Sequence, residues 1–157
     1  MSKYTNMTIK DAVGKISSGD IYLPAIQRKF VWKHTQIEKL FDSLMREYPI
    51  GTFLFWMLNG ENMNNYTFYK FIQEYHERDS RNEIRPTPEL KGNIIGVLDG
   101  QQRLSSMYIA LQGTYAYKKK YVSKKTDSAY PKRRLYLNLM YDGSNEEDYL
   151  YEFKFLD

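Results

Sequence analysis

Residues 93–112 contain the feature that most restricts the fold of this chain, an apolar run that passes directly into a helical pattern. The run Asn93–Leu98 is typical of a buried strand, and Asp99 and Gly100 follow it. From residue 101, apolar side chains recur at helical spacing until Gly113, at Leu104, Met107, Tyr108 and Leu111. A strand that turns within two residues into a helix favours a fold in which helices pack on a sheet.

Two further segments have the pattern of helices. Thr8 followed by Asp11 indicates a capped start, and the apolar spacing after it predicts a short helix that ends at Ser17–Gly19. Residues Thr35–Glu47 carry apolar side chains at positions i, i+3, i+4 and i+7, which predicts a second helix.

Other segments have the pattern of strands. The residues Thr52–Leu58 are apolar on both faces and predict a central buried strand, whereas the alternation in Leu135–Tyr141 and Tyr149–Phe155 predicts two more strands. Tyr66–Tyr75 is compatible with helix or strand. The expected fold is a single α/β domain over residues 1–157, a small mixed sheet flanked by the helices Thr35–Glu47 and Gln101–Gln112.

The composition excludes several kinds of site. The 157 residues include no Cys, which excludes disulfides, thiolate metal sites and a cysteine nucleophile. The two histidines, His34 and His76, have no identifiable catalytic partner. No stretch approaches the about 18 apolar residues of a membrane span, so we expect a cytoplasmic protein without membrane contact. The chain ends directly after its last strand pattern, which indicates the N-terminal part of a longer protein.

The junction Asp99–Arg103 has the residues of an anion site. The first N–H groups of a helix and the positive end of its dipole attract phosphate, Gly100 permits close approach, and Arg103 offers a planar fork. Asp99 would either cap the helix or bind Mg²⁺ carried by a nucleotide. The alternative is that Asp99 caps the helix while Gln101, Gln102 and Arg103 form a solvated face. The P-loop spacing is absent.

A second candidate segment is the loop Leu23–Trp32, in which basic residues lie among aromatic and apolar ones. Gln27 and Arg28 could reach polar ligand groups, and Phe30 or Trp32 could stack on a base. The alternative is that Ile26, Phe30 and Trp32 are core anchors of a rigid loop, with Arg28 paired with a neighbouring acid.

The two segments together carry a resemblance. Pro24–Trp32, Gln36–Leu44, Tyr48–Gly51 with Phe55-Trp56, and Leu98–Leu104 with its Asp-Gly-Gln-Gln-Arg block resemble, in this order, the N-terminal domain of the GmrSD-type family. The resemblance implies a ParB/sulfiredoxin-like nucleotide-binding domain of bacterial proteins of modification-dependent restriction and phage defence. It also implies hydrolysis of a nucleoside triphosphate and DNA cleavage by a separate HNH-type nuclease domain or subunit, which this chain lacks.

The resemblance assigns roles to individual residues. Asp99, Gly100, Gln101, Gln102 and Arg103 would form the phosphate loop, in which Asp99 would position Mg²⁺ or cap the helix. Gln27 and Arg28 would close over the nucleotide, and Gly51 and Thr52 would line the same pocket. Asp99, Gln101, Gln102 and Arg103 are the candidate catalytic residues, with either glutamine positioning water. The function that we expect is that of a nucleotide-binding, NTP-hydrolysing domain, and the alternative is a non-catalytic DNA-binding or regulatory sensor.

The charge distribution suggests a second ligand. The net charge is +4, but the segment 118–134 contains eight basic residues and one acid, interleaved with tyrosines. Such a segment has the charge and stacking groups of a nucleic-acid surface, and the alternative is a solvated loop. The candidate DNA-binding residues are Lys118, Lys119, Lys120, Lys124, Lys125, Lys132, Arg133 and Arg134.

Overall fold

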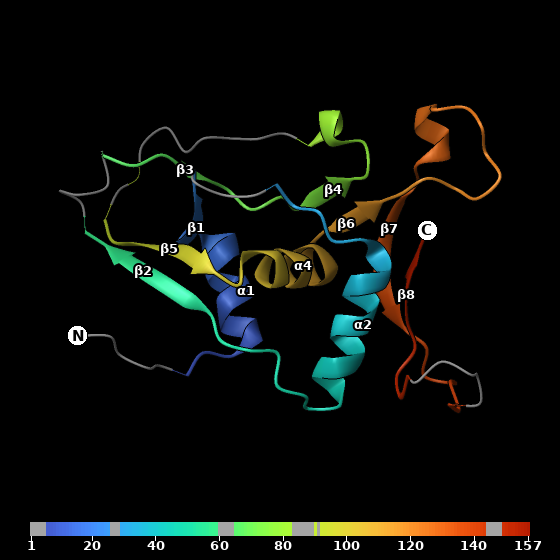
Figure 1. The fold of residues 1–157 in the computed structure, drawn as a ribbon, viewed down its shortest axis with the longest axis horizontal. Helices are drawn as coiled ribbons and strands as arrows, with labels where there is room; N and C mark the ends of the chain where they lie inside the picture. The colour runs from blue at the N-terminus through green and yellow to red at the C-terminus, as the bar shows by residue number, and fades with distance from the viewer. Residues whose placement is uncertain (1–5, 26–28, 60–64, 83–89, 91, 144–148) are drawn as a thin grey trace.

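The computed structural model describes residues 6–25, 29–59, 65–82, 90, 92–143 and 149–157. These residues form an α/β domain, as expected, but the strands are divided between two four-stranded sheets with helices between them (Figure 1). Figure 1 shows the first sheet on the left, the second on the right, and helix α4 between them. In the described part of the chain, no helix is long and apolar enough to span a membrane.

The first sheet has the strand order β2-β5-β1-β3. Its strands are β1 (Ile21–Pro24), β2 (Leu54–Leu58), β3 (Phe68–Tyr69) and β5 (Ile94–Asp99). β1 and β5 are parallel, and both edge strands are antiparallel to their neighbours. The inner strands are β5, whose Ile94 and Val97 are buried, and β1, whose Ile21 is buried.

The prediction that 52–58 is a central strand is wrong, because β2 lies at the edge of the sheet. Its side chains Leu54 and Met57 are 56% and 76% exposed. A run that is apolar on both faces is compatible with an edge strand whose second face is open, and only strand pairing separates the two cases.

The second sheet has the order β4-β6-β7-β8. Its strands are β4 (Glu74–His76), β6 (Thr114–Ala116), β7 (Lys132–Leu137) and β8 (Phe153–Leu156). The two strands expected near 135–141 and 149–155 exist, but β7 begins earlier and ends at Leu137, where Asn138 starts a turn by accepting the N–H of Met140 (3.0 Å). The ambiguous stretch 66–75 divides into β3 and the first two residues of β4, in different sheets.

The three predicted α-helices are present as α1 (Ile9–Ser18), α2 (His34–Met45) and α4 (Gln101–Gln112). The hydroxyl of Thr8 accepts the N–H of Asp11 (3.1 Å) at the start of α1, and Gly19 ends it with φ +81°. Two short 3₁₀ helices, η1 (Asp79–Arg81) and η2 (Asp127–Ala129), lie near the second sheet.

Helix α4 is the centre of the domain. It contacts α1, α2, β6 and β7, and every residue from Leu104 to Ala110 is buried. Leu111, expected on its apolar face, is 48% exposed instead. Because α4 is surrounded by other elements, its burial extends around the helix and exceeds what one apolar stripe predicts.

Candidate functional site

The turn between β5 and α4 contains the predicted phosphate loop. Asp99 is the exposed last residue of β5, and Gly100 occupies the N-cap position in the left-handed conformation, φ +85°. No side chain caps the helix, so the interpretation of Asp99 as the helix cap is wrong. The carboxylate therefore lies free of that role beside the N-terminus of a buried helix.

Arg103, in the first turn of α4, ties this turn to the loop before β2. Its guanidinium donates to the carbonyl oxygens of Ile50 and Thr52, the latter at 2.8 Å, and lies 5.0 Å from the ring centre of Phe53. The structure thus brings Gly51 and Thr52 next to Arg103, although about 50 residues of sequence separate them.

Two glycines make this close approach possible. Gly51 has φ +84°, and a Cβ atom built on it would lie 2.4 Å from Nη1 of Arg103. A Cβ atom on Gly100 would lie 2.4 Å from the ring of Phe53. Both glycines therefore make room for Arg103 and Phe53, a packing reason that the sequence does not reveal.

The two glutamines of the predicted phosphate loop bind backbone groups, which contradicts the alternative of a solvated face. Nε2 of Gln101 donates to the carbonyl oxygens of Val97 (2.8 Å) and Leu98 (3.2 Å). Gln102 binds a loop instead, because its Nε2 donates to the carbonyl of Lys29 (3.0 Å) and its Oε1 accepts the N–H of Val31 (3.0 Å). Gln102 therefore joins α4 to the second candidate segment.

Ile26, Gln27 and Arg28 lie outside the described residues. The residues that follow them approach the site through Gln102. Phe30 and Trp32 pack against the buried cluster around Ile37 and Ile109, and Phe30 meets the ring of Tyr75 edge-on at 4.9 Å. These contacts support the interpretation of Phe30 and Trp32 as core anchors.

The donor set around the junction limits what metal could bind. The described residues contain no group of three or more His, Cys, Asp or Glu placed to hold a metal ion. Asp99 would therefore act as a single protein carboxylate. One protein carboxylate is commonly sufficient for Mg²⁺ when the phosphates of the substrate supply other ligands.

The described cavities lie away from this junction. One, of about 310 Å³, is bounded by α2 and the segment 149–154, and the other, of about 600 Å³, by the end of α1 and residues 70–74. Neither is lined by a residue that the sequence analysis assigned to a site.

Both histidines have structural surroundings. His34 begins α2 and stacks on Tyr117 with the ring centres 3.8 Å apart. Burial, with help from the charge of Arg133, holds the pKa of His34 below its usual value. Nδ1 of His76 accepts the N–H of Arg78 (3.1 Å), and burial followed by the charge of Arg78 lowers the pKa of His76. For both rings the lowered pKa favours the neutral imidazole.

The predicted DNA-binding residues fall into two groups. Five lysines lie on the segment between β6 and η2, namely Lys118, Lys119, Lys120, Lys124 and Lys125. The others lie on β7, where Lys132 pairs with Glu74 (2.6 Å) and Arg134 is exposed.

Arg133 is 6% exposed, so it does not form part of a basic surface. Its guanidinium donates to the carbonyl of Tyr117 (2.7 Å), lies over the ring of Tyr117 and pairs with Asp157 (3.7 Å). Alternation along β7 places its side chain on the inner face and those of residues 132 and 134 on the outer face.

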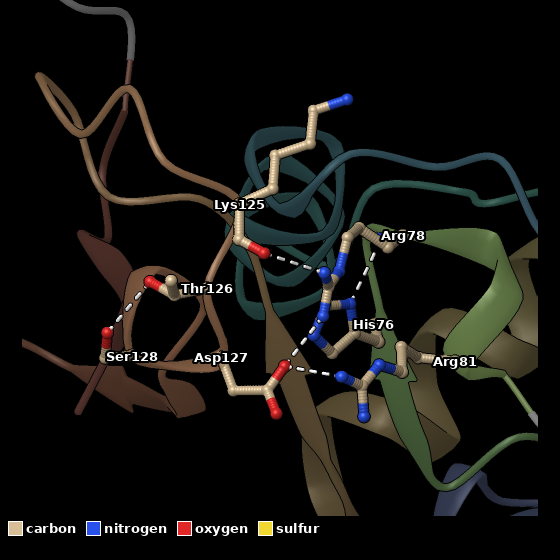
Figure 2. Close-up of polar contacts among 7 residues, drawn as sticks. All are labelled: His76, Arg78, Arg81, Lys125, Thr126, Asp127 and Ser128. Carbon is tan, nitrogen blue, oxygen red and sulfur yellow. Dashed lines mark hydrogen bonds and ion pairs between the residues drawn. The ribbon is translucent and has the colours of Figure 1, made fainter.

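The sequence analysis did not identify two arginines that have a structural role. Arg78 and Arg81 both pair with Asp127, across more than 45 residues of sequence, at 2.8 and 2.6 Å (Figure 2). No residue near either arginine in the sequence predicts this cluster. Only knowledge of the contact between the two segments could have identified it.

The comparisons with known proteins agree with these motifs. The uncharacterized protein MJ0686 of Methanocaldococcus jannaschii is 41% identical over 101 residues, which cover 64% of this chain and 16% of that protein. The family model described as the GmrSD restriction endonuclease, N-terminal domain, matches residues 9–156. This chain therefore belongs to the family of GmrSD restriction endonuclease N-terminal domains.

Proposed function

We propose that this chain is the nucleotide-binding, NTP-hydrolysing domain of a restriction or phage-defence protein, in which hydrolysis drives or gates DNA cleavage by a separate HNH-type nuclease. Its membership of a family of restriction endonuclease N-terminal domains supports the biological setting. The nucleotide, the hydrolysis and the nuclease partner are parts of the proposal.

The bridge made by Arg103 is the observation that carries the proposal. It gathers the phosphate-loop residues, Gly51 and Thr52 at one end of the first sheet. In the described part of the chain its partners are two neutral carbonyl oxygens and the face of Phe53, which leave its positive charge available to an anion. A guanidinium has five N–H donors, so it can hold the loop and a phosphate together.

The residues at the junction fit a magnesium-bound triphosphate. The first N–H groups of α4 have no partners within the helix and face the turn at Gly100. Asp99 is exposed beside them, where a divalent cation would separate its carboxylate from a phosphate. The bound cation would supply charge neutralisation during phosphoryl transfer, and Arg103 would add to it.

A specific observation favours a second candidate, binding without hydrolysis. The carboxamides of Gln101 and Gln102 are both bound to backbone groups, so either would have to exchange these bonds to position a water molecule. A non-catalytic sensor or regulatory module needs no such exchange.

Titration of a fluorescent ATP analogue and a fluorescent GTP analogue, with and without Mg²⁺, tests the proposal. Asp99→Asn removes the charge of an exposed side chain and should weaken magnesium-dependent binding by about 10- to 100-fold, the effect of one charge-assisted contact. Arg103→Lys should weaken binding with and without Mg²⁺, because a lysine keeps the charge and loses the fork.

Arg78→Ala is the matched control, because it removes a guanidinium that also binds a loop carbonyl, far from the junction. If Asp99→Asn and Arg78→Ala bind nucleotide as the wild type does, the phosphate loop is wrongly assigned. Clear binding without release of inorganic phosphate, with DNA present, would select the non-catalytic candidate.

A further inference from the structure

The segment between β6 and η2 concentrates positive charge. Residues 118–126, called the basic loop below, contain five lysines and no acidic residue. In Figure 1 this orange segment extends away from the two sheets at the upper right. A charged loop is often only solvated, so its conformation decides whether it forms a binding surface.

The basic loop is held at its first two residues and in its middle. The N–H of Lys118 donates to the carboxylate of Glu77 (2.9 Å), and the N–H of Lys119 donates to the carbonyl of Ala129 (2.8 Å). Val122 packs against the buried cluster of Ala116, Ala129 and Tyr130. These contacts fix the course of the backbone while leaving most of its lysine side chains in solvent.

Asp127, Arg78 and Arg81, called the clamp below, hold the far end of the loop. Asp127 accepts from Arg78 (2.8 Å) and Arg81 (2.6 Å), and Arg78 also donates to the carbonyl of Lys125 (3.0 Å). The charge of Arg81, then the hydrogen bonds from both arginines, lower the pKa of Asp127. Figure 2 shows the side chain of Lys125 pointing away from this clamp while its carbonyl faces Arg78.

The clamp has an electrostatic consequence. Asp127 is shared between two arginines, so these three charged groups sum to one positive charge, which offsets the negative charge of Glu77 at the start of the loop. Arg78 is in addition held over the ring of Tyr130, 5.0 Å from its centre.

Tyr121 lies in the turn at residues 120–121 of the loop and is fully exposed. Its φ is +64°, an uncommon conformation for an aromatic residue, while its neighbour Val122 packs inward. Tyr121 lies between Lys120 and Lys124 in the sequence. Its exposed ring can stack on an unpaired base while the neighbouring lysines bind phosphates.

We infer that the basic loop is a binding site for single-stranded DNA, in which the lysines bind phosphates, Tyr121 stacks on an unpaired base, and Asp127, Arg78 and Arg81 position the loop. The site lies beside the second sheet, whereas the proposed nucleotide site lies at the end of the first. The inference is therefore independent of the proposed nucleotide binding.

Fluorescence anisotropy with a labelled thymidine oligomer, at several salt concentrations, tests the inference. The affinity should fall steeply with salt, and Lys124→Gln should reduce the slope of log affinity against log salt by about 0.7. Tyr121→Ser should weaken binding by about 5- to 100-fold, as expected for loss of one stacked base. A duplex of equal length should bind more weakly and respond little to Tyr121→Ser.

Asp127→Asn separates positioning from net charge. The substitution makes the chain more positive, so charge alone predicts tighter binding, whereas loss of the clamp predicts weaker binding. Asp127→Glu, which can still accept from both arginines, should restore part of the affinity. Glu47→Gln is the matched control, because it makes the same charge change at an exposed residue beyond the end of α2.

Several results would overturn the inference. Binding that is absent or insensitive to salt removes the site, and equal effects of Asp127→Asn and Glu47→Gln remove the positioning role. An unchanged affinity of Tyr121→Ser, or a preference for duplex, removes the stacking, and tighter binding of a uridine oligomer removes the assignment to DNA. Urea unfolding midpoints of the variants, which alter exposed side chains, show whether each remains folded.

Discussion

Gly51→Ala tests whether the contact between Arg103 and the loop before β2 organises the candidate site. At this position alanine meets two obstacles. The backbone φ of +84° is unfavourable for any residue with a Cβ atom, and that atom would lie 2.4 Å from Nη1 of Arg103, well inside van der Waals contact.

The expected cost follows from these two obstacles. The left-handed conformation costs about 1–2 kcal/mol. Displacement of Arg103 removes two hydrogen bonds from a charged donor, each worth about 1.5 kcal/mol at the lower end of the range that suits this half-buried side chain. The free energy of unfolding should therefore fall by about 4–5 kcal/mol.

A double-mutant cycle separates the two contributions. In an Arg103→Ala background the obstructing guanidinium is absent, so Gly51→Ala should cost only about 1–2 kcal/mol. Gly92→Ala is the matched control, since Gly92 has φ +80° and a Cβ atom there would meet nothing within 4 Å. Urea unfolding followed by tryptophan fluorescence measures all of these variants.

The reasoning fails if Gly51→Ala costs no more than Gly92→Ala. It also fails if the two substitutions are additive within about 0.5 kcal/mol, the usual agreement for independent sites. In either case Arg103 would not hold the loop, and Gly51 and Thr52 would lose the contact that places them beside the predicted phosphate loop.

Two further predictions concern stability. Asp42 is 4% exposed and accepts the N–H groups of residues 150 and 151 at 3.0 and 2.8 Å, so Asp42→Ala should lower the free energy of unfolding by about 3 kcal/mol, measured by urea unfolding, and an effect below about 1 kcal/mol would show that these contacts are replaceable. The pKa values of His34 and His76 are lowered in the folded protein, so the unfolded chain binds protons first as the pH falls. The free energy of unfolding should therefore be greatest above about pH 6.5 and fall below it. A urea midpoint that is flat between about pH 7.5 and 5.5 in the wild type, or an unchanged fall in a variant lacking both rings, would contradict this.

The helices illustrate what local sequence can predict. Thr8, Asp11 and Gly19 are sufficient to define both ends of α1, because capping depends on groups within a few residues of each other. The bounds of α4 are also those that its sequence predicts. Strand pairing has no such local signal. For this reason the run 52–58 was predicted as a central strand although it lies at the edge, and β6 was not predicted.

In the candidate site, too, local features were predicted from the sequence and contacts between distant segments were not. The sequence identified the block Asp99–Arg103 and its position between a buried strand and a helix. It did not predict that Arg103 binds the loop before β2, or that Gln102 binds the loop before α2. A side chain that binds a distant carbonyl needs no particular partner residue, so such contacts leave no pattern in the sequence.

For the basic segment 118–134, too, the sequence determines some properties and the tertiary structure determines others. Its charge and its tyrosines are properties of the sequence alone, and they suffice to predict an affinity for polyanions. The direction of each side chain is a property of the tertiary structure, which buries Arg133 and exposes Tyr121.

By itself, then, the sequence determined the α/β class, the helices, the family motifs and the position of the charges, because these depend on composition and on spacing along the chain. Only the tertiary structure decided the division into two sheets, the partners of Arg103 and the clamp around Asp127. These depend on contacts between segments about 50 residues apart, which form only when the whole domain packs around α4.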